Sequence, residues 1–396
     1  MISVEVNSKN RLGVMKLNFE LTDEQKMLQK MIREFAEEVV APGAIERDRT
    51  KQFPKEIFKQ LGEMGIMGLP FEETYGGAGS DTISFAIVTE ELSKACASTG
   101  ITYSAHISLG GAPLQLFGTK EQKEKFLTPI CLGESFGAFG LTEPNAGSDA
   151  GGTETTAMLD EDNIYTINGS KIFITNASYA NHLALTAVTG IKNGKKQISS
   201  IIVPTNSTGF TISEPYEKMG LNSSNTTELI LQDVQVPKEY LLGVEGEGFK
   251  QFLVTLDGGR IGIAAMAVGI AQAAYSKALK YAKERTQFGQ AISSFQVTQF
   301  KLADMALKIE LARNMVYKAA WLKDQQKPFT KEASMAKLYA TEIAMEIARE
   351  AIQIHGGYGY MREYEVERYL RDAKLLEIGE GTSEVQRMVI SRIIGC

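Results

Sequence analysis

In the first third of the chain, apolar residues recur at the three- and four-residue spacing that is typical of an amphipathic helix. The first run of this kind comprises Leu28, Met31, Ile32, Phe35 and Val39. Thr22 and Gln25 precede it with the spacing of a capping box, and Pro42 follows it at a point where a proline would end a helix. The pattern therefore predicts a helix that starts after Thr22 and ends before Pro42.

Further helix signals follow along the same third of the chain. Pro54 suits the first turn of a second helix, which Gly65 can close, and residues 81–98 form another helical stretch. Thr119 and Gln122 repeat the spacing of a capping box. These signals predict that the N-terminal part is helical throughout.

The pattern changes near residue 135, where short runs of β-branched residues begin, separated by Asn, Gly and Asp. Such alternation with turn residues predicts an antiparallel sheet. After residue 249 the helical spacing returns and persists to the C-terminus. Strands do not alternate with helices, which disfavours a parallel-sheet nucleotide fold. The predicted fold is mostly α with a central β domain. Its parts are an N-terminal extension (1–16), an N-terminal helical domain (17–134), a middle antiparallel β domain (135–245) and a C-terminal helical bundle (246–396).

The composition is ordinary for a globular protein, with 43% hydrophobic and 23% charged residues. The net charge of −6 argues against nucleic acid or an anionic membrane as the main partner. The longest apolar stretch, residues 261–275, is too short to span a bilayer and predicts a buried helix. We therefore expect no membrane insertion, and the first residues lack the pattern of a signal peptide.

The cysteines Cys96, Cys131 and Cys396 match no disulfide framework and no metal-binding spacing. The three histidines show no ligand spacing either. We therefore expect reduced thiols, a cytoplasmic protein and no metal site.

Two segments around the middle domain carry candidate chemistry. Residues 139–152 read FGLTEPNAGSDAGG and offer backbone N–H groups and hydroxyls to a phosphate or to the edge of a ring. In residues 168–177, Phe173 and Thr175 share one face of the predicted strand, where a ring and a hydroxyl could contact a flat cofactor. A surface turn explains the first segment equally well, and an ordinary half-buried strand explains the second segment better when it is taken alone.

Three more candidates lie in the C-terminal part. Residues 284–296 combine Arg285 with an aromatic side chain and two amides, a set that can hold a phosphorylated ligand. Residues 353–374 begin QIHGGYGY, where glycines allow close approach of a ligand to the backbone. Glu380 lies between two glycines. It is either a solvated loop carboxylate or a catalytic base held close to a substrate.

Taken together, in this order and spacing, the segments resemble the acyl-CoA dehydrogenase family over about residues 17–396. The segments that carry the resemblance are LTEPNAGSDAG, GSKIFITN, LDGGRIG, ERTQFG, QIHGGYGY and EGTSEVQR. TLDGGRIGIAA, at residues 255–265, is most similar to the short-chain, butyryl-CoA-type branch. The resemblance implies FAD as cofactor, acyl-CoA as substrate, an electron-transferring flavoprotein as electron acceptor, and a homotetramer.

The resemblance implies that the middle domain surrounds the flavin ring. Leu141 and Thr142 would meet the ring edge, and Thr175 would lie near the reactive nitrogen. Phe173 stands where many family members carry Trp, so the N–H donor of that ring is lost. The implied flavin-contacting residues are Phe139, Leu141, Thr142, Gly147, Ser148, Phe173, Ile174 and Thr175.

The ADP part of FAD would contact a neighbouring subunit, which would make the oligomer necessary for cofactor retention. The residues implied for this contact are Arg285, Gln287, Phe288, Gln296, Gln353, Gly356 and Gly357. Thr382, Ser383 and Glu384 would contact FAD as well.

The resemblance also implies that Glu380 is the base that removes the α-proton of the thioester, while the β-hydride goes to the flavin. The other position at which family members carry this base is occupied here by Gly259, which cannot accept a proton. The residues implied to line the substrate are Ser148, Asp257, Arg260, Gly379 and Gly381.

Gly379 departs from short- and medium-chain members, which usually carry Tyr before the base, and matches isovaleryl-type members. We expect short straight-chain substrates such as butyryl-CoA, with tolerance of branched C4–C5 groups. The alternative is a dehydrogenase of isobutyryl-, 2-methylbutyryl- or isovaleryl-CoA. An oxidase or flavin monooxygenase on the same fold, and a DNA-associated or structural relative, are disfavoured by the chain length of 396 and by the net charge of −6, respectively.

Overall fold

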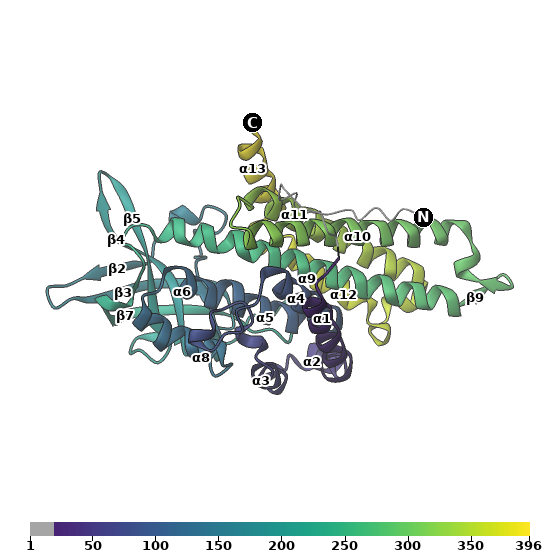
Figure 1. Ribbon diagram of the computed structural model, residues 1–396, viewed down its shortest axis with the longest axis horizontal. Coiled ribbons are helices and arrows are strands. Elements are labelled where there is room, and N and C mark those ends of the chain that lie inside the picture. The colour runs from purple at the N-terminus through teal and green to yellow at the C-terminus, as the bar shows by residue number, and fades with distance from the viewer. Residues whose placement is uncertain (1–19) are drawn as a thin grey trace, which may run out of the picture.

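The computed structural model describes residues 20–396, so the predicted extension over residues 1–16 lies outside the described residues. Helices, a β-sheet and again helices follow one another along the chain, which confirms the predicted fold class. Figure 1 shows the sheet at one end of the molecule, the long C-terminal helices along its length, and the N-terminal helices beside them.

The N-terminal part consists of short helices that begin at the predicted caps. Thr22 N donates to Gln25 Oε1 at 3.0 Å and Thr22 Oγ1 accepts from Gln25 N at 3.2 Å, which completes the first capping box. Thr119 and Gln122 form the second. The short helices α2, α5 and α6 match no individually predicted helix, although this whole part was predicted to be helical. The helical elements are α1 (Asp23–Phe35), η1 (Ala36–Val40), α2 (Ala44–Thr50), α3 (Lys55–Glu63), η2 (Ile66–Gly68), η3 (Glu73–Tyr75), α4 (Thr82–Ala95), α5 (Ala97–Ala105), η4 (His106–Gly111), α6 (Ala112–Phe117), α7 (Lys120–Gln122), η5 (Lys123–Leu127) and α8 (Thr128–Cys131).

One eight-stranded sheet forms the middle part, in the order β6-β7-β3-β2-β4-β5-β8 with β1 beside β4. Most pairings are antiparallel, as predicted, whereas β1 and β2 pair briefly with β4 in parallel. The alternating residues of its inner face, such as Tyr165, Ile167, Leu183 and Leu185, form a core of their own. The strands are β1 (Phe139–Gly140), β2 (Thr156–Leu159), β3 (Ile164–Thr175), β4 (His182–Lys192), β5 (Lys195–Pro204), β6 (Phe210–Ile212), β7 (Thr226–Pro237) and β8 (Leu241–Leu242); the short helices η6 (Ala150–Gly152), η7 (Ala177–Tyr179) and η8 (Lys238–Tyr240) lie between them.

The C-terminal part is a bundle around the long helix α9. A small two-stranded hairpin, whose turn is formed by Phe288 (φ +50°) and Gly289 (φ +81°), separates α9 from α10. Helix α9 ends at Glu284, before this hairpin. The elements are α9 (Gly248–Glu284), β9 (Thr286–Gln287), β10 (Gln290–Ala291), η9 (Ile292–Ser294), α10 (Gln296–Asp324), α11 (Thr330–His355), η10 (Gly356–Tyr360), η11 (Arg362–Tyr364), α12 (Val366–Leu376) and α13 (Ser383–Ile394).

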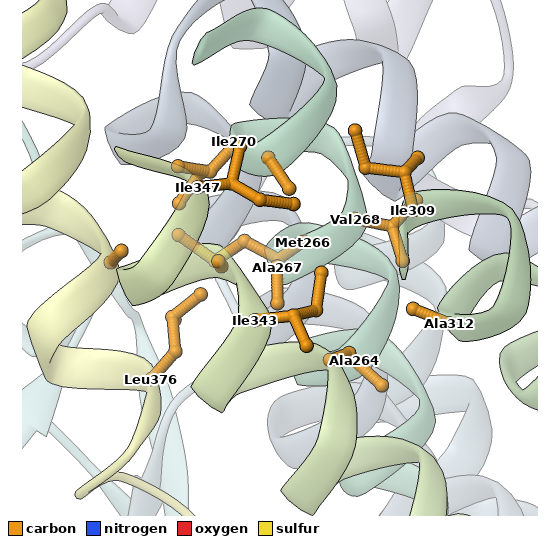
Figure 2. Packing of buried hydrophobic residues seen from close by; sticks show 14 of the residues in the cluster. Ala264, Met266, Ala267, Val268, Ile270, Ile309, Ala312, Ile343, Ile347 and Leu376 are labelled. Carbon is orange, nitrogen blue, oxygen red and sulfur yellow. The ribbon is translucent and has the colours of Figure 1, made fainter. Parts of the chain in front are cut away.

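Small residues allow the neighbouring helices to approach α9 closely. A Cβ built at Gly269 would lie only 2.9 Å from Ser93 Cβ of α4, so any larger residue would separate the two helices. Each large apolar side chain that is buried between these helices contributes about 1.5–3 kcal/mol. Figure 2 shows the centre of this packing, where α9 meets α10, α11 and α12 through Met266, Val268, Ile309, Ile343, Ile347 and Leu376.

By length and composition α9 could cross a membrane, since it has 37 residues and its most apolar window has a mean hydropathy of 1.5. The expectation that no stretch is long enough was therefore wrong as to length. However, 72% of that window is buried inside the molecule, as expected for a core helix. The apolar composition of α9 follows from its place at the centre of the bundle.

Candidate active site

Glu380 lies in the short loop that joins α12 to α13. Two backbone N–H groups, those of Ile378 and Gly379, donate to Leu375 O at 2.9 and 2.8 Å and close the end of α12. Thr382 caps α13 by accepting from Val385 N at 3.3 Å. Between these two caps, Glu380 (φ +54°) and Gly381 (φ +92°) adopt left-handed backbone conformations. A non-glycine residue held in this region is uncommon and is concentrated at functional sites.

The Glu380 carboxylate points at α9, where Gly259 leaves room for it. A Cβ built at Gly259 would overlap Glu380 Oε2 and lie 3.0 Å from Glu380 Cδ. The two alternative base positions that the sequence analysis compared therefore converge on the same point in space. Only one of them can carry a side chain, and in this molecule it is Glu380.

Burial governs the ionisation of this carboxylate. Glu380 as a residue is only half-buried, but its Oε2 atom is buried and has no hydrogen-bond partner among the described residues. Burial raises the pKa of Glu380 to about 7, against the charges of Lys337 and Arg260, which lower it. A carboxylate with a pKa near neutrality and a free oxygen is suited to general-base chemistry.

Arg260 and Asp257, both predicted to line the substrate, form an ion pair on α9. Arg260 Nη1 lies 2.5 Å from Asp257 Oδ1, and the side chain of Arg260 is buried. Asp257 Oδ2 also accepts from Thr330 Oγ1 at 2.7 Å, and Ser334 Oγ lies 3.3 Å from Arg260 Nη1. The pair is thereby tied to the first turns of α11, which holds the α9 side of the site.

Two residues of this site were missed by the sequence analysis. Lys337 of α11 is fully buried, and its Nζ donates to Gly381 O at 2.7 Å. Gln386 of α13 is also fully buried and donates from Nε2 to Gly381 O at 2.9 Å and to Glu380 O at 3.3 Å. The available signal was a lysine between Ala336 and Ala340 on the buried face of a predicted helix, where charge is rare.

The predicted flavin-contacting segment around Phe139 is held against β3. The ring of Phe139 stacks on that of Phe252 of α9, with centroids 3.8 Å apart. Leu141 O accepts from Lys171 Nζ at 3.2 Å, and Thr142 O accepts from Ile172 N at 2.9 Å. Farther along the segment Gly147 and Ser148 are exposed, and Leu141 and Thr142 are half-buried.

A second buried ion pair, missed by the sequence analysis, holds this segment in place. Lys171 Nζ lies 2.6 Å from Glu143 Oε1, and Glu143 also accepts from the backbone N–H groups of Glu154 and Thr155. Burial raises the pKa of Glu143, but Lys171 and these hydrogen bonds outweigh it and leave the pKa below its usual value. Burial lowers the pKa of Lys171 to about 8, against the attraction of Glu143.

The end of β3 departs from simple alternation. The register with β7 shifts between Lys171 and Ile174, and Phe173 has φ +60° at this bulge. Phe173 is 62% exposed and Thr175 half-buried, while Ile174 between them is buried. A bulge commonly redirects a side chain beside a functional site, and here it exposes an aromatic ring.

The residues predicted for the ADP part lie at the opposite end of α9. Arg285, Gln287, Gly356 and Gly357 line one cavity of about 480 Å³, together with Tyr281, Ile292, Ile354, His355, Tyr358 and Met361. The Arg285 guanidinium lies 5.8 Å from the centre of the Tyr358 ring. A Cβ built at Gly356 or Gly357 would meet nothing within 4 Å, so the backbone there faces open space.

The other predicted cofactor contacts lie outside this cavity. Phe288 is 94% exposed at the hairpin turn, Gln296 begins α10, and Gln353 is exposed in the last turn of α11. Ser383 Oγ, near Glu380, is buried without a hydrogen-bond partner among the described residues. A cavity with a guanidinium, aromatic rings and open glycine backbone, and an exposed ring at Phe173, both fit the parts of FAD.

Comparison with known proteins covers most of the chain. Three family models match: "Acyl-CoA dehydrogenase, N-terminal domain" at residues 22–134, "middle domain" at 138–234 and "C-terminal domain" at 246–395. The chain is 62% identical to the "Probable acyl-CoA dehydrogenase YngJ" of Bacillus subtilis over 377 residues, 95% of this chain and 99% of the relative.

Solved structures of similar proteins also match over nearly the whole chain. The chain resembles butyryl-CoA dehydrogenase from Megasphaera elsdenii with a TM-score of 0.93 and 48% identity, over 96% of this chain and all of that one. A chain in a structure of the electron transferring flavoprotein of Acidaminococcus fermentans is similar with a TM-score of 0.93 and 50% identity, over 96% and 100% of the two chains.

Proposed function

Because the chain belongs to the acyl-CoA dehydrogenase family, FAD-dependent oxidoreductases that act on the CH–CH bond of acyl-CoA, we propose that it converts short-chain acyl-CoA to trans-2-enoyl-CoA. The acyl group that it takes is butyryl or close to butyryl. The observation that carries the proposal is the Glu380 carboxylate, which fills the space left by Gly259 with one oxygen free of hydrogen bonds.

Glu380 acts as the base in this proposal. Its pKa of about 7, raised by burial, allows it to be ionised in the free enzyme and still to be basic enough to take an α-proton. Among the described residues its Oε2 atom accepts no hydrogen bond, so no hydrogen bond has to break before this oxygen takes the proton. The backbone N–H of Glu380 would polarise the thioester carbonyl, where negative charge develops. The left-handed backbone at Glu380 and Gly381 would bring the carboxylate to the α-carbon and the N–H to the carbonyl oxygen of one thioester.

Bound FAD would supply the acceptor for the β-hydride. In this proposal Phe139 to Ser148 and Phe173 to Thr175 hold the flavin ring, and the cavity around Arg285 holds the ADP part. Gly248 at the start of α9 packs on the sheet at Ser199, whereas Arg285 follows its far end. The 37 residues of α9 separate these regions by about 55 Å, which is longer than an extended FAD molecule.

The two halves of the cofactor site would therefore come from different chains, which supports an oligomer, and the resemblance implies that this oligomer is a homotetramer. The face of α10 beside the Arg285 hairpin offers a surface for such assembly. Large apolar side chains are exposed along it at helical spacing: Val297, Phe300, Leu307 and Leu311, with Phe288 on the hairpin. An exposed apolar row of this kind is typical of an interface.

We further propose that electrons leave through an electron-transferring flavoprotein, as the resemblance implies. The similarity to a chain from a structure of such a flavoprotein supports this acceptor. The predicted cytoplasmic location fits this proposal and stays a prediction.

Gly379 supports the tolerance of branched acyl groups. A Cβ built there would meet only Leu375 O at 3.6 Å and Leu375 Cγ at 4.0 Å, so there is room for a side chain that this chain lacks. The short branched-chain dehydrogenase remains the second candidate on the strength of this opening.

Anaerobic mixing of the FAD-loaded protein with a panel of acyl-CoA thioesters tests the proposal. We expect flavin bleaching to be fastest with butyryl-CoA and slower with isobutyryl-, 2-methylbutyryl- and isovaleryl-CoA. The reverse order would favour the branched-chain candidate, and absence of bleaching with every thioester would reject both. Oxygen consumption without an added acceptor would instead identify an oxidase.

A further inference from the structure

Lys337 lies beside the Glu380 loop without contacting the reacting atoms of the proposed reaction. Its side chain is fully buried in α11, where its Nζ donates to Gly381 O at 2.7 Å. A buried lysine is rare unless it is paired. We propose that Lys337 is a positioning residue that fixes the backbone of Glu380 and Gly381 and keeps the Glu380 carboxylate ionised at neutral pH. The proposal rests on the proposed role of Glu380 as the base.

The first part of this role is geometric. Lys337 Nζ and Gln386 Nε2 both donate to Gly381 O, and Gln386 Nε2 also reaches Glu380 O. The two donors come from different helices, α11 and α13, and so hold the loop from two sides. Left-handed backbone at a non-glycine residue persists only where its surroundings enforce it. These hydrogen bonds provide that constraint at Glu380.

The second part is electrostatic. Burial raises the pKa of Glu380 to about 7, and the Lys337 ammonium is the foremost charge that opposes this rise. Burial in turn lowers the pKa of Lys337 to about 8, and Glu380 opposes that change. Each group thus helps to keep the other charged, and the two titrate as a coupled pair. Without the ammonium, a smaller fraction of the Glu380 carboxylate would be ionised at pH 7, and less of the enzyme would have its base in the active form.

The other charged groups near the site cannot replace Lys337. Arg260 faces Glu380 from α9, but its charge is compensated by Asp257 at 2.5 Å. Glu377 in the loop and Glu342 on α11 are acids that favour the charged form of Lys337. On α10, Lys323 is exposed and lies beside Gly258, with its Nζ 3.5 Å from a Cβ built there, but its charge is not among those that act on Glu380. Two cations among the described residues act on Glu380, namely Lys337 and Arg260. Of these two, only Lys337 has no carboxylate partner of its own.

Three variants separate the two parts of the role. Lys337→Gln keeps a hydrogen-bond donor and removes the charge, Lys337→Met removes both, and Gln386→Leu weakens the clamp without any change in charge. The measurement is the pH dependence of anaerobic flavin bleaching by butyryl-CoA in the holoenzyme. A second readout needs no turnover: the pH titration of the protonated carboxyl band in infrared difference spectra, identified by its absence in Glu380→Gln.

We expect both Lys337 variants to move the apparent pKa of Glu380 upwards by one to two units, because an adjacent opposite charge has been lost. This lowers the bleaching rate at pH 7 by roughly 5- to 50-fold, with recovery towards pH 9 in Lys337→Gln. Lys337→Met should recover less because the clamp is lost as well. Gln386→Leu should lower the rate at all pH values and leave the infrared titration where it is.

Lys308→Met serves as the matched control. Lys308 pairs with Glu346, which lies on α11 nine residues beyond Lys337, so the same charge is removed at a distance from the loop. This control should titrate as the wild type does. An unmoved infrared titration and pH profile in both Lys337 variants would overturn the inference while leaving Glu380 as the base. Bleaching at the wild-type rate by Glu380→Gln would instead overturn the proposed function itself.

Discussion

Lys171 and Lys337 are both buried, and each lies near a glutamate with a buried carboxylate oxygen, but the two pairs differ in one contact. Lys171 forms a direct ion pair with the Glu143 carboxylate at 2.6 Å, and that carboxylate also accepts hydrogen bonds from two backbone N–H groups. Lys337 bonds instead to a backbone carbonyl, and the Oε2 atom of Glu380 has no hydrogen-bond partner among the described residues. Burial lowers the pKa of both lysines to about 8.

The consequence for the two carboxylates is opposite. Direct hydrogen bonds hold the pKa of Glu143 below its usual value despite burial, whereas burial raises the pKa of Glu380 to about 7. Hydrogen bonds to a charged carboxylate stabilise it, and a nearby charge alone does so only in part. The first pair therefore holds a strand and a loop together, and the second leaves a carboxylate free to react.

The largest effect should come from Glu380→Gln, which removes the free carboxylate. We expect the variant to bind FAD and to bleach at least about 10³-fold more slowly with butyryl-CoA, within the range that general-base catalysis contributes. Stopped-flow absorbance of the flavin measures it. Glu377→Gln is the control in the same loop, since the Glu377 carboxylate pairs with Lys374 at 2.6 Å and acts on Lys337 only through its charge. Equal loss in both variants would show that the loop, and not the base, had been damaged.

Lys171→Met should break the first pair and leave Glu143 buried without its cation. Removal of one partner from a buried ion pair costs about 3–5 kcal/mol of unfolding free energy. Chemical denaturation followed by circular dichroism and by FAD release measures the loss. In the double variant Lys171→Met/Glu143→Leu part of the stability should return, because no charge stays buried. If the double variant were as unstable as the single one, the ion pair would not be the cause.

Gly259→Ala, next to the Lys337–Glu380 pair, should lower the activity without lowering the stability. Its Cβ would occupy the position of Glu380 Oε2 and push the carboxylate away, so we expect the bleaching rate to fall about 100-fold. The stability of α9 should increase, since Ala is favoured over Gly inside a helix by about 1 kcal/mol. Gly258→Ala is the control, because its Cβ would make only ordinary contacts with Lys323, at 3.5 and 3.9 Å. A normal rate in Gly259→Ala would contradict the placement of Glu380.

The pH dependence of the wild-type enzyme should report the raised pKa of Glu380. A base acts in its ionised form, so the bleaching rate should rise about tenfold per unit below pH 7 and level off above it. Glu143, whose pKa is lowered, should stay ionised throughout this range and contribute no step. A rate that was already level at pH 5 would show that Glu380 titrates as an ordinary carboxyl.

The sequence predicted most of the fold because its signals are local. The capping residues Thr22 and Thr119 and the small residues of α9 determine where helices begin and which one is central. The small hairpin at Phe288 was missed because it depends on two residues in left-handed conformations inside a helical pattern. The two flanking glycines directed attention to Glu380, and motif resemblance, not periodicity, favoured a base over a solvated loop carboxylate.

The rest of the site depends on contacts between residues distant in sequence. Lys337 and Glu380 are brought together by the packing of α11 against the loop after α12, and Lys171 and Glu143 by the path of β3. Periodicity shows that a lysine falls on a buried face, but it does not show which group it meets. The resemblance alone implied cofactor contacts across two chains, and the length of α9 supports that proposal.

Gly379 gives the smallest and most selective test, because a substitution there would alter the proposed acyl pocket and leave the Glu380 carboxylate in place. Its φ lies outside the left-handed region, and a Cβ there meets only Leu375 at 3.6 Å or more, so a larger side chain can be added without backbone strain. We expect Gly379→Tyr to keep butyryl-CoA bleaching within a few-fold and to lower that of isobutyryl- and 2-methylbutyryl-CoA by about tenfold or more, since a methyl group that no longer fits costs about 1–3 kcal/mol. Gly379→Ala should leave the ratio of straight to branched rates near that of the wild type. If Gly379→Tyr slowed both kinds of substrate equally, the added ring would act on the Glu380 loop, and the selectivity would arise elsewhere in the pocket.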